Sequence, residues 1–281
     1  MLFNGFFNSN FKSNQLKQYS LIDDIGTQHT FDKVPQRIIS LVPSQTELLV
    51  DLGLEAKLVG ITKFCIHPKD LRIKKQIVGG TKKVDYDKIR ALAPDIIICN
   101  KEENTLEIVE NLREICHVWV TDIISVEDNF NMISDFGNLF DCVAEAENWN
   151  RKLALAFSDF KSFITTKPVK KVAYFIWKNP YMVAGSGNFI DELLQLNHFE
   201  NAFANQPRYP EIELEKLNPD GDLNYVFLSS EPYPFKEKDA LKMANYTNSA
   251  KCIFVDGEMF SWHGSRLLKA FDYFKELRQK L

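Results

Sequence analysis

The chain has 281 residues, with 34 Lys and Arg against 38 Asp and Glu, a formal net charge of -4, and 45% hydrophobic residues. This length allows two modest domains, since single hydrophobic cores stop growing near ~250–300 residues. The slightly acidic balance argues against nucleic acid or an anionic membrane as the main partner, and no apolar stretch approaches the ~20 residues of a membrane span.

The N-terminus and the cysteines bear on the compartment. Residues 1–19 predict a weakly ordered leader without the basic start and unbroken apolar run of a signal peptide, and no cysteine stands where a lipid would be attached. Taken as written, the sequence carries no export address, and a cytoplasmic location stays open. The cysteines are widely spaced without a CxxC pair, which favours reduced, mostly buried thiols; they are Cys65, Cys99, Cys116, Cys142 and Cys252.

Strand patterns recur through the first half of the chain. Residues 18–31 predict a small hairpin with its turn near Gly26. The continuous apolar run RIISLV at 37–42 predicts a strand buried on both faces of a parallel sheet. Further strands are predicted at 58–62, 77–81, 96–100 and 117–122.

Helices are predicted between these strands. SQTE at 44–47 matches a capping box, so Ser44 is predicted to cap a helix that Gly53 ends. Three more helices are predicted to begin at Asp85, at KEEN (101–104) and at Ser125. Strands that alternate with helices in this way indicate right-handed βαβ units.

A long helix without glycine or proline is predicted from Asp141 to Thr166. It would span roughly 35 Å at 1.5 Å per residue. Lys152, Ser158, Asp159 and Lys161 fall on its polar face. Its apolar face carries Trp149, Leu153, Ala156, Phe157, Phe160 and Ile164 at three- and four-residue spacing.

The alternation resumes after Pro168, so the sequence predicts an α/β protein of two lobes joined by one long helix. Strands are predicted at 170–177, 224–230 and 251–257, and helices at 189–196, over ELEKL (213–217) and from Ser265 to the end. The expected divisions are a leader at 1–19, an N-terminal lobe at 20–140, a connecting helix at 141–167 and a C-terminal lobe at 168–281.

The loops that follow the strands are the expected ligand site, because open α/β sheets bind ligands beyond the carboxyl ends of their strands. Several of these loops combine aromatic and polar residues, which is typical of a pocket for a sizeable organic or metal-chelate ligand. The same aromatics could equally be core or lobe-interface residues. The candidate ligand-binding residues are Phe64, Cys65, His67, Lys101, Trp177, Tyr181, Arg208, Tyr209, Glu258, Trp262 and His263.

Metal and catalytic signatures are weaker. Cys65, His67, Glu258 and His263 are candidate metal ligands, but their spacing matches no structural zinc site, and a single axial ligand to a chelated metal is favoured over a bare ion. Glu102 and Glu103 are expected to cap a helix. We found no catalytic signature, since Ser44 lacks a nucleophile-elbow context and no G-x-G-x-x-G follows the first strand.

The runs RIISLVPSQTELLVDLGL, LVGITKFCIHP, IVGGT and DYDKIRALAPDIII resemble the solute-binding proteins of cobalamin and iron-siderophore ABC importers. These belong to the helical-backbone metal receptor group, and the nearest pattern is the cobalamin-binding (BtuF-type) branch. The resemblance covers nearly the whole chain from about Val34. It implies two Rossmann-like lobes joined by one long helix, a ligand between the lobes with little closure, and no catalysis.

The resemblance also implies particular site residues. The cleft tyrosine of the cobalamin binders matches Phe64, their second-lobe tryptophan matches Tyr209, and their last acidic cleft residue matches Glu258. One acidic residue on each lobe docks on the permease. These match Asp87 and Glu215, and Glu211 and Glu213 are alternatives to the second.

The sequence departs from the family pattern in two ways, which leave the identity of the ligand and the cellular compartment undecided. The first-lobe tryptophan of the cobalamin binders falls at Thr81, and the pairs Cys65/His67 and Trp262/His263 have no counterpart in that branch. Family members work outside the inner membrane, whereas no export signal is read here.

The hypothesis is therefore a monomeric ABC-importer binding protein that needs no cofactor, partners a permease and carries a corrinoid, or else haem or a ferric siderophore. The alternatives are a cytoplasmic metal- or tetrapyrrole-dependent enzyme, a ligand sensor, or an interaction module that has lost its ligand.

Overall fold

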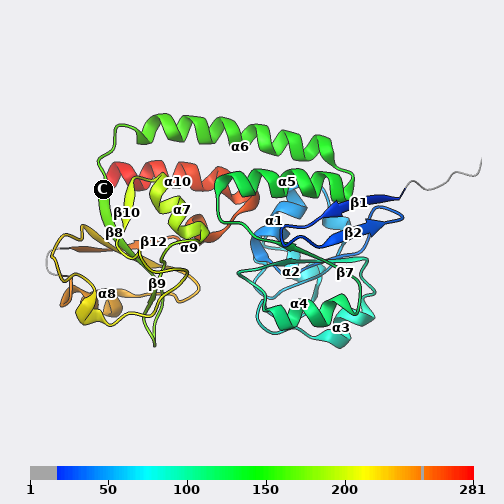
Figure 1. Ribbon diagram of the computed structural model, residues 1–281, viewed down its shortest axis with the longest axis horizontal. Helices are drawn as coiled ribbons and strands as arrows, with labels where there is room; N and C mark the ends of the chain where they lie inside the picture. The colour runs from blue at the N-terminus through cyan, green and yellow to red at the C-terminus, as the bar shows by residue number, and fades with distance from the viewer. Residues whose placement is uncertain (1–17, 248–249) are drawn as a thin grey trace, which may run out of the picture.

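The computed structural model describes residues 18–247 and 250–281, so the expected leader lies outside the described residues except for its last two positions. Two parallel sheets lie side by side, and helices cover them (Figure 1). The α/β fold with two lobes agrees with the expectation from the sequence.

The first lobe is built on a five-stranded parallel sheet in the order β5-β4-β3-β6-β7. The central strand β3 is fully buried, as the apolar run RIISLV predicts, and so is β6 beside it. The strands are β3 (Ile38–Ser40), β4 (Leu58–Ile61), β5 (Gln76–Ile77), β6 (Ile96–Asn100) and β7 (His117–Thr121). The helices are α1 (Pro43–Asp51), α2 (Leu71–Lys74), α3 (Tyr86–Ala91), α4 (Leu106–Arg113) and α5 (Val126–Phe140), with a 3-10 turn η1 (Glu55–Lys57).

The predicted hairpin is present as β1 (Tyr19–Ile22) and β2 (Gln28–Phe31), and Gly26 takes the positive φ of +83° that its turn needs. It lies along the edge strand β7. The Asp23 carboxylate accepts a hydrogen bond from the Val120 amide at 3.2 Å, and the Val120 carbonyl accepts one from the Asp24 amide at 3.2 Å. These bonds occupy backbone groups that an open sheet edge would expose.

Two predicted helix starts are wrong and two are confirmed. Proline at the first position of α1, with its φ already helical, moves the start ahead of Ser44, which makes no cap. KEEN forms a turn, and Thr105 caps α4 instead, so Glu102 and Glu103 do not cap it. Asp85 and Ser125 cap α3 and α5 as predicted.

The second lobe is built on the parallel order β10-β8-β11-β12, with β9 antiparallel to β8. The strands are β8 (Lys170–Trp177), β9 (Met182–Val183), β10 (Phe199–Asn201), β11 (Tyr225–Ser229) and β12 (Lys251–Val255). The helices are α7 (Phe189–Leu196), α8 (Glu237–Ala244), α9 (Gly257–Ser261) and α10 (Leu267–Lys280), with 3-10 turns η2 (Leu214–Lys216) and η3 (Gly264–Arg266). β9, β10, α8 and α9 were not predicted from the sequence, because they are short or weakly patterned.

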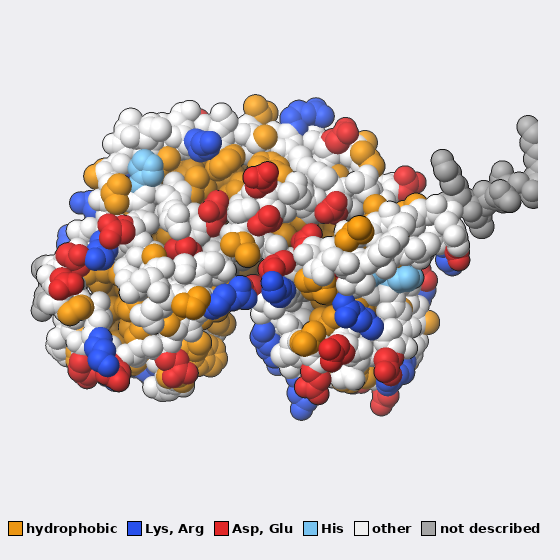
Figure 2. All heavy atoms as spheres, in the orientation of Figure 1, with side chains coloured by type: hydrophobic (Ala, Val, Ile, Leu, Met, Phe, Trp, Pro, Cys, Tyr) orange, Lys and Arg blue, Asp and Glu red, His pale blue; other side chains and the backbone are white. Residues whose placement is uncertain are grey.

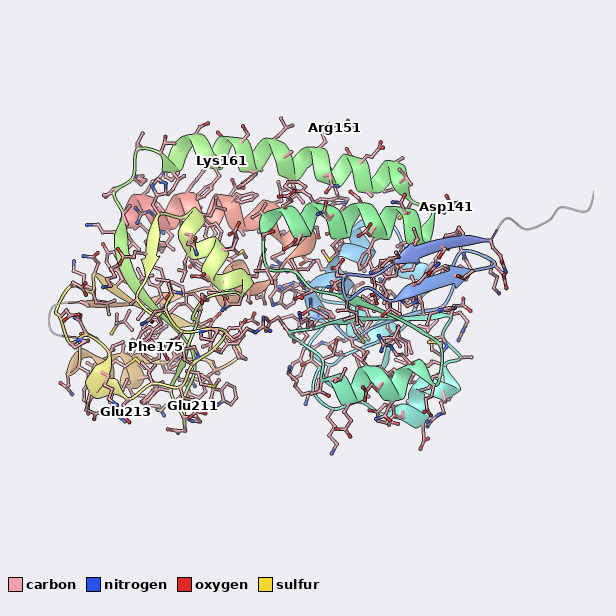
Figure 3. The ribbon with its side chains drawn as sticks, in the orientation of Figure 1. Asp141, Arg151, Lys161, Phe175, Glu211 and Glu213 are labelled. Atoms are coloured by element: carbon pink, nitrogen blue, oxygen red, sulfur yellow. The ribbon has the colours of Figure 1, made fainter. Side chains whose placement is uncertain are left out.

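The connecting helix is α6 (Val143–Ile164), which runs over both lobes and packs on α5 and α10 (Figure 1). Leu153, Phe160 and Ile164 are buried, whereas Arg151 and Lys161 are exposed (Figure 3). A Cβ added at Gly137 of α5 would lie 2.7 Å from the Cβ of Ala146, so this glycine permits the close approach of α5 and α6. The predicted apolar stripe of the helix is therefore confirmed.

Candidate functional site in the cleft between the lobes

A segment of the second lobe reaches into the first and joins them on the α6 side of the cleft. The Arg266 guanidinium donates to both carboxylate oxygens of Glu47, at 2.8 and 3.0 Å, and both residues are buried. Beside this pair, Ser265 donates to Asp51, and the Gly264 amide donates to Asn129. We call these six residues the interlobe anchor. Bidentate Arg–carboxylate pairs fix orientation as well as distance, so the anchor sets the separation of the lobes.

A cavity of about 80 Å³ lies between the carboxyl ends of the strands of both lobes. We call it the central cavity. It is lined by Pro43, Ser44, Asn100, Glu102, Glu103, Ile123, Phe189, Ile190, Tyr209, Ser261, Trp262 and His263. Six residues singled out from the sequence therefore meet here from both lobes: Ser44, Glu102, Glu103, Tyr209, Trp262 and His263.

His263 lies at the inner wall of the central cavity. Its Nδ1 is 2.9 Å from the Ser44 hydroxyl and its Nε2 is 3.3 Å from the Gln45 amide nitrogen. Burial lowers the pKa of His263 to about 4, so the ring is neutral near pH 7. Both ring nitrogens already have hydrogen-bond partners, Ser44 at Nδ1 and Gln45 at Nε2.

Trp262 forms an aromatic wall of the same cavity. Its indole N–H donates to the Glu231 carboxylate at 2.8 Å, and Ser261 donates to the same oxygen at 2.9 Å. Burial raises the pKa of Glu231 to about 7, with the nearby Glu258 charge adding to the rise against these hydrogen bonds. The Arg266 guanidinium lies 5.1 Å from the ring centre, so the anchor also supports Trp262.

An ion pair crosses the mouth of the cleft. Arg208 of the second lobe pairs with Glu102 of the first, and its other guanidinium nitrogen donates to the Gly187 carbonyl at 3.2 Å. We call the pair of Arg208 and Glu102 the cleft bridge. Figure 2 shows a notch between the lobes on the side away from α6, with basic and acidic side chains gathered at its head. Burial raises the pKa of Glu102 despite the Arg208 charge.

A second and more open hollow of about 700 Å³ flanks α9. His67 lies 2.9 Å from Glu258 across the lobes, and Glu258 also pairs with Arg266 at 3.1 Å. His67 and Glu258 thus line this hollow beside α9, not the central cavity. The remaining lining residues are Ile66, Ser230, Phe254, Val255, Asp256, Met259, Arg266 and Tyr273.

The structure separates the other predicted ligand residues from the central cavity. Cys65 is fully buried, with its thiol 3.1 Å from the Thr46 hydroxyl, so it belongs to the first-lobe core. Tyr181 packs on Phe175 in a separate second-lobe core, with ring centres 6.1 Å apart. These two predictions are corrected, because side chains packed inside a lobe do not face the cleft.

Phe64, Lys101 and Trp177 are exposed at or just after strand ends and line neither hollow. Phe64 is 48% exposed under the Lys63 ammonium, 5.0 Å from its ring centre. Lys101 pairs with Asp122. Trp177 packs edge-on against Tyr233, with ring centres 5.9 Å apart.

The metal candidates do not converge. Cys65, His67 and His263 each make separate contacts, and within residues 18–247 and 250–281 no group of three or more His, Cys, Asp or Glu side chains could hold a metal ion. These three side chains therefore do not jointly coordinate a free metal ion.

Several important residues were missed from the sequence. Glu231 follows β11 in a loop that the strand-end rule does select, so its position was a usable signal. Glu47 and Arg266 are 219 positions apart, and no local pattern in the sequence links them.

The candidate docking acids lie on the face away from α6. Asp87 of α3 has a side chain 98% exposed, and Glu211, Glu213 and Glu215 are all exposed near η2. Figures 1 and 3 place α3 and the labelled Glu211 and Glu213 at the lower edges of the two lobes.

Comparison with known proteins decides the family. A family described as periplasmic binding protein matches residues 38–240, which is most of the chain. The chain belongs to the periplasmic binding protein family. Its family members are binding proteins, not enzymes, in agreement with the lack of a catalytic signature.

Individual proteins agree with this assignment. The chain is 26% identical over 268 residues to an uncharacterised ABC transporter substrate-binding lipoprotein, YvrC, of Bacillus subtilis, covering 91% of this chain and 84% of that protein. The structure is similar to the vitamin B12-binding protein BtuF of Vibrio cholerae, with a TM-score of 0.75, 18% identity, and coverage of 88% and 99%. It is also similar to a periplasmic heme-binding protein of Pseudomonas aeruginosa, with a TM-score of 0.75, 19% identity, and coverage of 87% and 92%.

No helix in the described part of the chain is both long and apolar enough to cross a membrane.

Proposed function

We propose that this protein is the substrate-binding subunit of an ABC importer, acts in the periplasm or cell envelope, and carries a metal chelate, with a corrinoid ahead of haem or a ferric siderophore. The main support is the convergence of strand-end loops from both lobes on one cavity walled by Trp262 and Tyr209. The similarity to a substrate-binding lipoprotein supports the transport role and the location.

The charge of the cleft favours a ligand without exposed anionic groups. Glu102 and Glu103 line the central cavity, Glu231 lies behind Trp262, and no Lys or Arg is among the cavity-lining residues in the described chain. The Arg208 charge at the mouth is already paired with Glu102. Carboxylates of haem or of an anionic siderophore would meet this acidic lining, whereas the amide side groups of a corrinoid would find hydrogen-bond partners.

The central cavity needs to open for such a ligand. A volume of about 80 Å³ is far below the ~300–1,000 Å³ of pockets for drug-sized ligands. The cleft bridge crosses the mouth and is partly exposed, so separation of Arg208 from Glu102 is the least costly way to admit a chelate. The ligand would then rest against Tyr209 and Trp262.

The permease would bind the face that carries the cleft mouth. Asp87 and Glu215 are exposed, one on each lobe, and basic sockets on a permease would pair with them. Glu211 and Glu213 stay alternatives for the second acid. Charge reversal at Asp87 should reduce transport in a reconstituted importer without changing ligand affinity.

Binding to defined chelates tests this proposal. The protein is mixed with cyanocobalamin, cobinamide, haemin and ferric siderophores, and melting temperature and Trp fluorescence are followed. At a hundredfold excess over Kd, linkage predicts about 2.7 kcal/mol of stabilisation. Tyr209→Ser should weaken binding at least tenfold, while the matched aromatic change Trp177→Phe, away from the cavity, should not. If none of the four changes either observable, the chelate assignment fails.

A further inference from the structure

Two histidines that the cleft does not use meet under the N-terminal hairpin. His29 of β2 and His117 of β7 bring their Nδ1 atoms to 3.4 Å. His29 is 5% exposed, whereas His117 is exposed at the start of an edge strand. The pair is thus reachable from solvent on one side and held rigidly on the other.

Asp23 determines which ring nitrogen of His29 is unprotonated. Its carboxylate accepts hydrogen bonds from the backbone N–H groups of Thr27, at 2.7 Å, and Val120, at 3.2 Å. The same carboxylate lies 3.3 Å from Nε2 of His29. A carboxylate that already accepts several hydrogen bonds takes one more from Nε2–H, so the lone pair of His29 is on Nδ1. A carboxylate on the far nitrogen of a ligating histidine is the usual arrangement in zinc sites.

The two Nδ1 atoms lie within hydrogen-bonding distance of each other, and their separation of 3.4 Å also fits shared coordination of one metal ion. Two imidazole nitrogens bound at ~2.0–2.1 Å to one tetrahedral Zn²⁺ lie about 3.3 Å apart. Imidazole nitrogens suit Zn²⁺, Cu²⁺ and Ni²⁺.

We propose that His29 and His117 form a two-histidine site for a divalent transition metal, completed by water, that ties the hairpin to β7. The site is outside the cleft and is independent of the chelate that the cleft carries. With two protein ligands, the site leaves coordination positions for water, whereas a structural zinc site has four protein ligands.

Calorimetric titration of tag-free, EDTA-treated protein with Zn²⁺ tests the site, and Cu²⁺ titration provides a second readout. We expect one Zn²⁺ per chain and quenching of Trp119, whose ring centre is 5.4 Å from that of His29, by Cu²⁺. His117→Gln keeps a hydrogen-bond donor for His29 and removes a ligand, so it should weaken Zn²⁺ binding at least tenfold. The matched change His67→Gln should leave this site unchanged.

Electron paramagnetic resonance of the Cu²⁺ complex should report two imidazole nitrogens in the wild type and fewer in His117→Gln. The proposal is overturned if the wild type binds no stoichiometric Zn²⁺ or Cu²⁺, or if His117→Gln binds as tightly as the wild type. Chelate binding in the cleft should be the same in both proteins, which separates this result from a failure of the transport proposal.

Discussion

Two of the ion pairs that connect the lobes differ in almost every physical respect. The Arg266–Glu47 pair of the interlobe anchor is bidentate, with side chains 4% and 8% exposed. The cleft bridge joins Arg208 and Glu102, whose side chains are 42% and 21% exposed. A buried pair is costly to break, because each partner would be left without compensation, whereas an exposed pair exchanges readily with water. The cleft is therefore fixed near α6 and adjustable at its mouth.

This comparison refines the role of α6. The family resemblance implies little closure between two lobes joined by one long helix. The anchor adds a second, non-covalent connection through η3, which contacts both α1 and α5 of the first lobe. Two separated connections resist rotation better than one, so small changes at the loops are expected on binding, without wide closure.

Breaking the anchor should have the largest effect. Arg266→Met leaves Glu47 buried with only the partly exposed Lys269, 3.4 Å away, and should cost about 3–5 kcal/mol of unfolding free energy. Urea denaturation measures this loss. The control Lys269→Ala should cost about 0–1 kcal/mol. Replacing both partners, Glu47→Gln with Arg266→Met, should recover part of the loss, and equal losses in the single and double variants would contradict a paired anchor.

Replacing Glu231 should have an effect of intermediate size on the unfolding free energy, and this effect should depend on pH. Its pKa is raised from 4.5 to about 7, so its stability contribution is fully present below pH 4.5 and is lost as pH rises to about 7. Glu231→Gln mimics the protonated acid and should be more stable than the wild type by about 1–3 kcal/mol at pH 8, and equally stable at pH 4. Thermal unfolding across this range measures the difference. Identical pH profiles for the variant and the wild type would refute the assignment, and Glu237→Gln on exposed α8 is the control.

Breaking the cleft bridge should have the smallest effect on stability. Glu102→Gln should change the unfolding free energy by about 0–1 kcal/mol, because the pair is partly exposed. The same change should speed ligand association in stopped-flow experiments, because the Arg208–Glu102 ion pair no longer has to break before the ligand enters the cleft. A stability loss as large as that of Arg266→Met would show that the mouth is as fixed as the anchor.

The sequence predicts the layers of the fold better than the site. The apolar runs at β3 and β6 and the stripe of α6 have local periodicity, so they can be recognised within a short window. The Arg266–Glu47 and Arg208–Glu102 pairs join distant parts of the chain and have no such signal. Cys65 shows the converse problem, because a loop position next to Phe64 and His67 suggests the cleft while its side chain turns into the core.

Small-angle X-ray scattering, with and without the chelate that raises the melting temperature most, tests the central claim most directly. With the lobes fixed by α6 and the interlobe anchor, the radius of gyration should be the same in both states within error, while Trp fluorescence reports a filled cleft. A clear decrease in the radius on binding would mean that the lobes close as whole bodies, which would contradict this account.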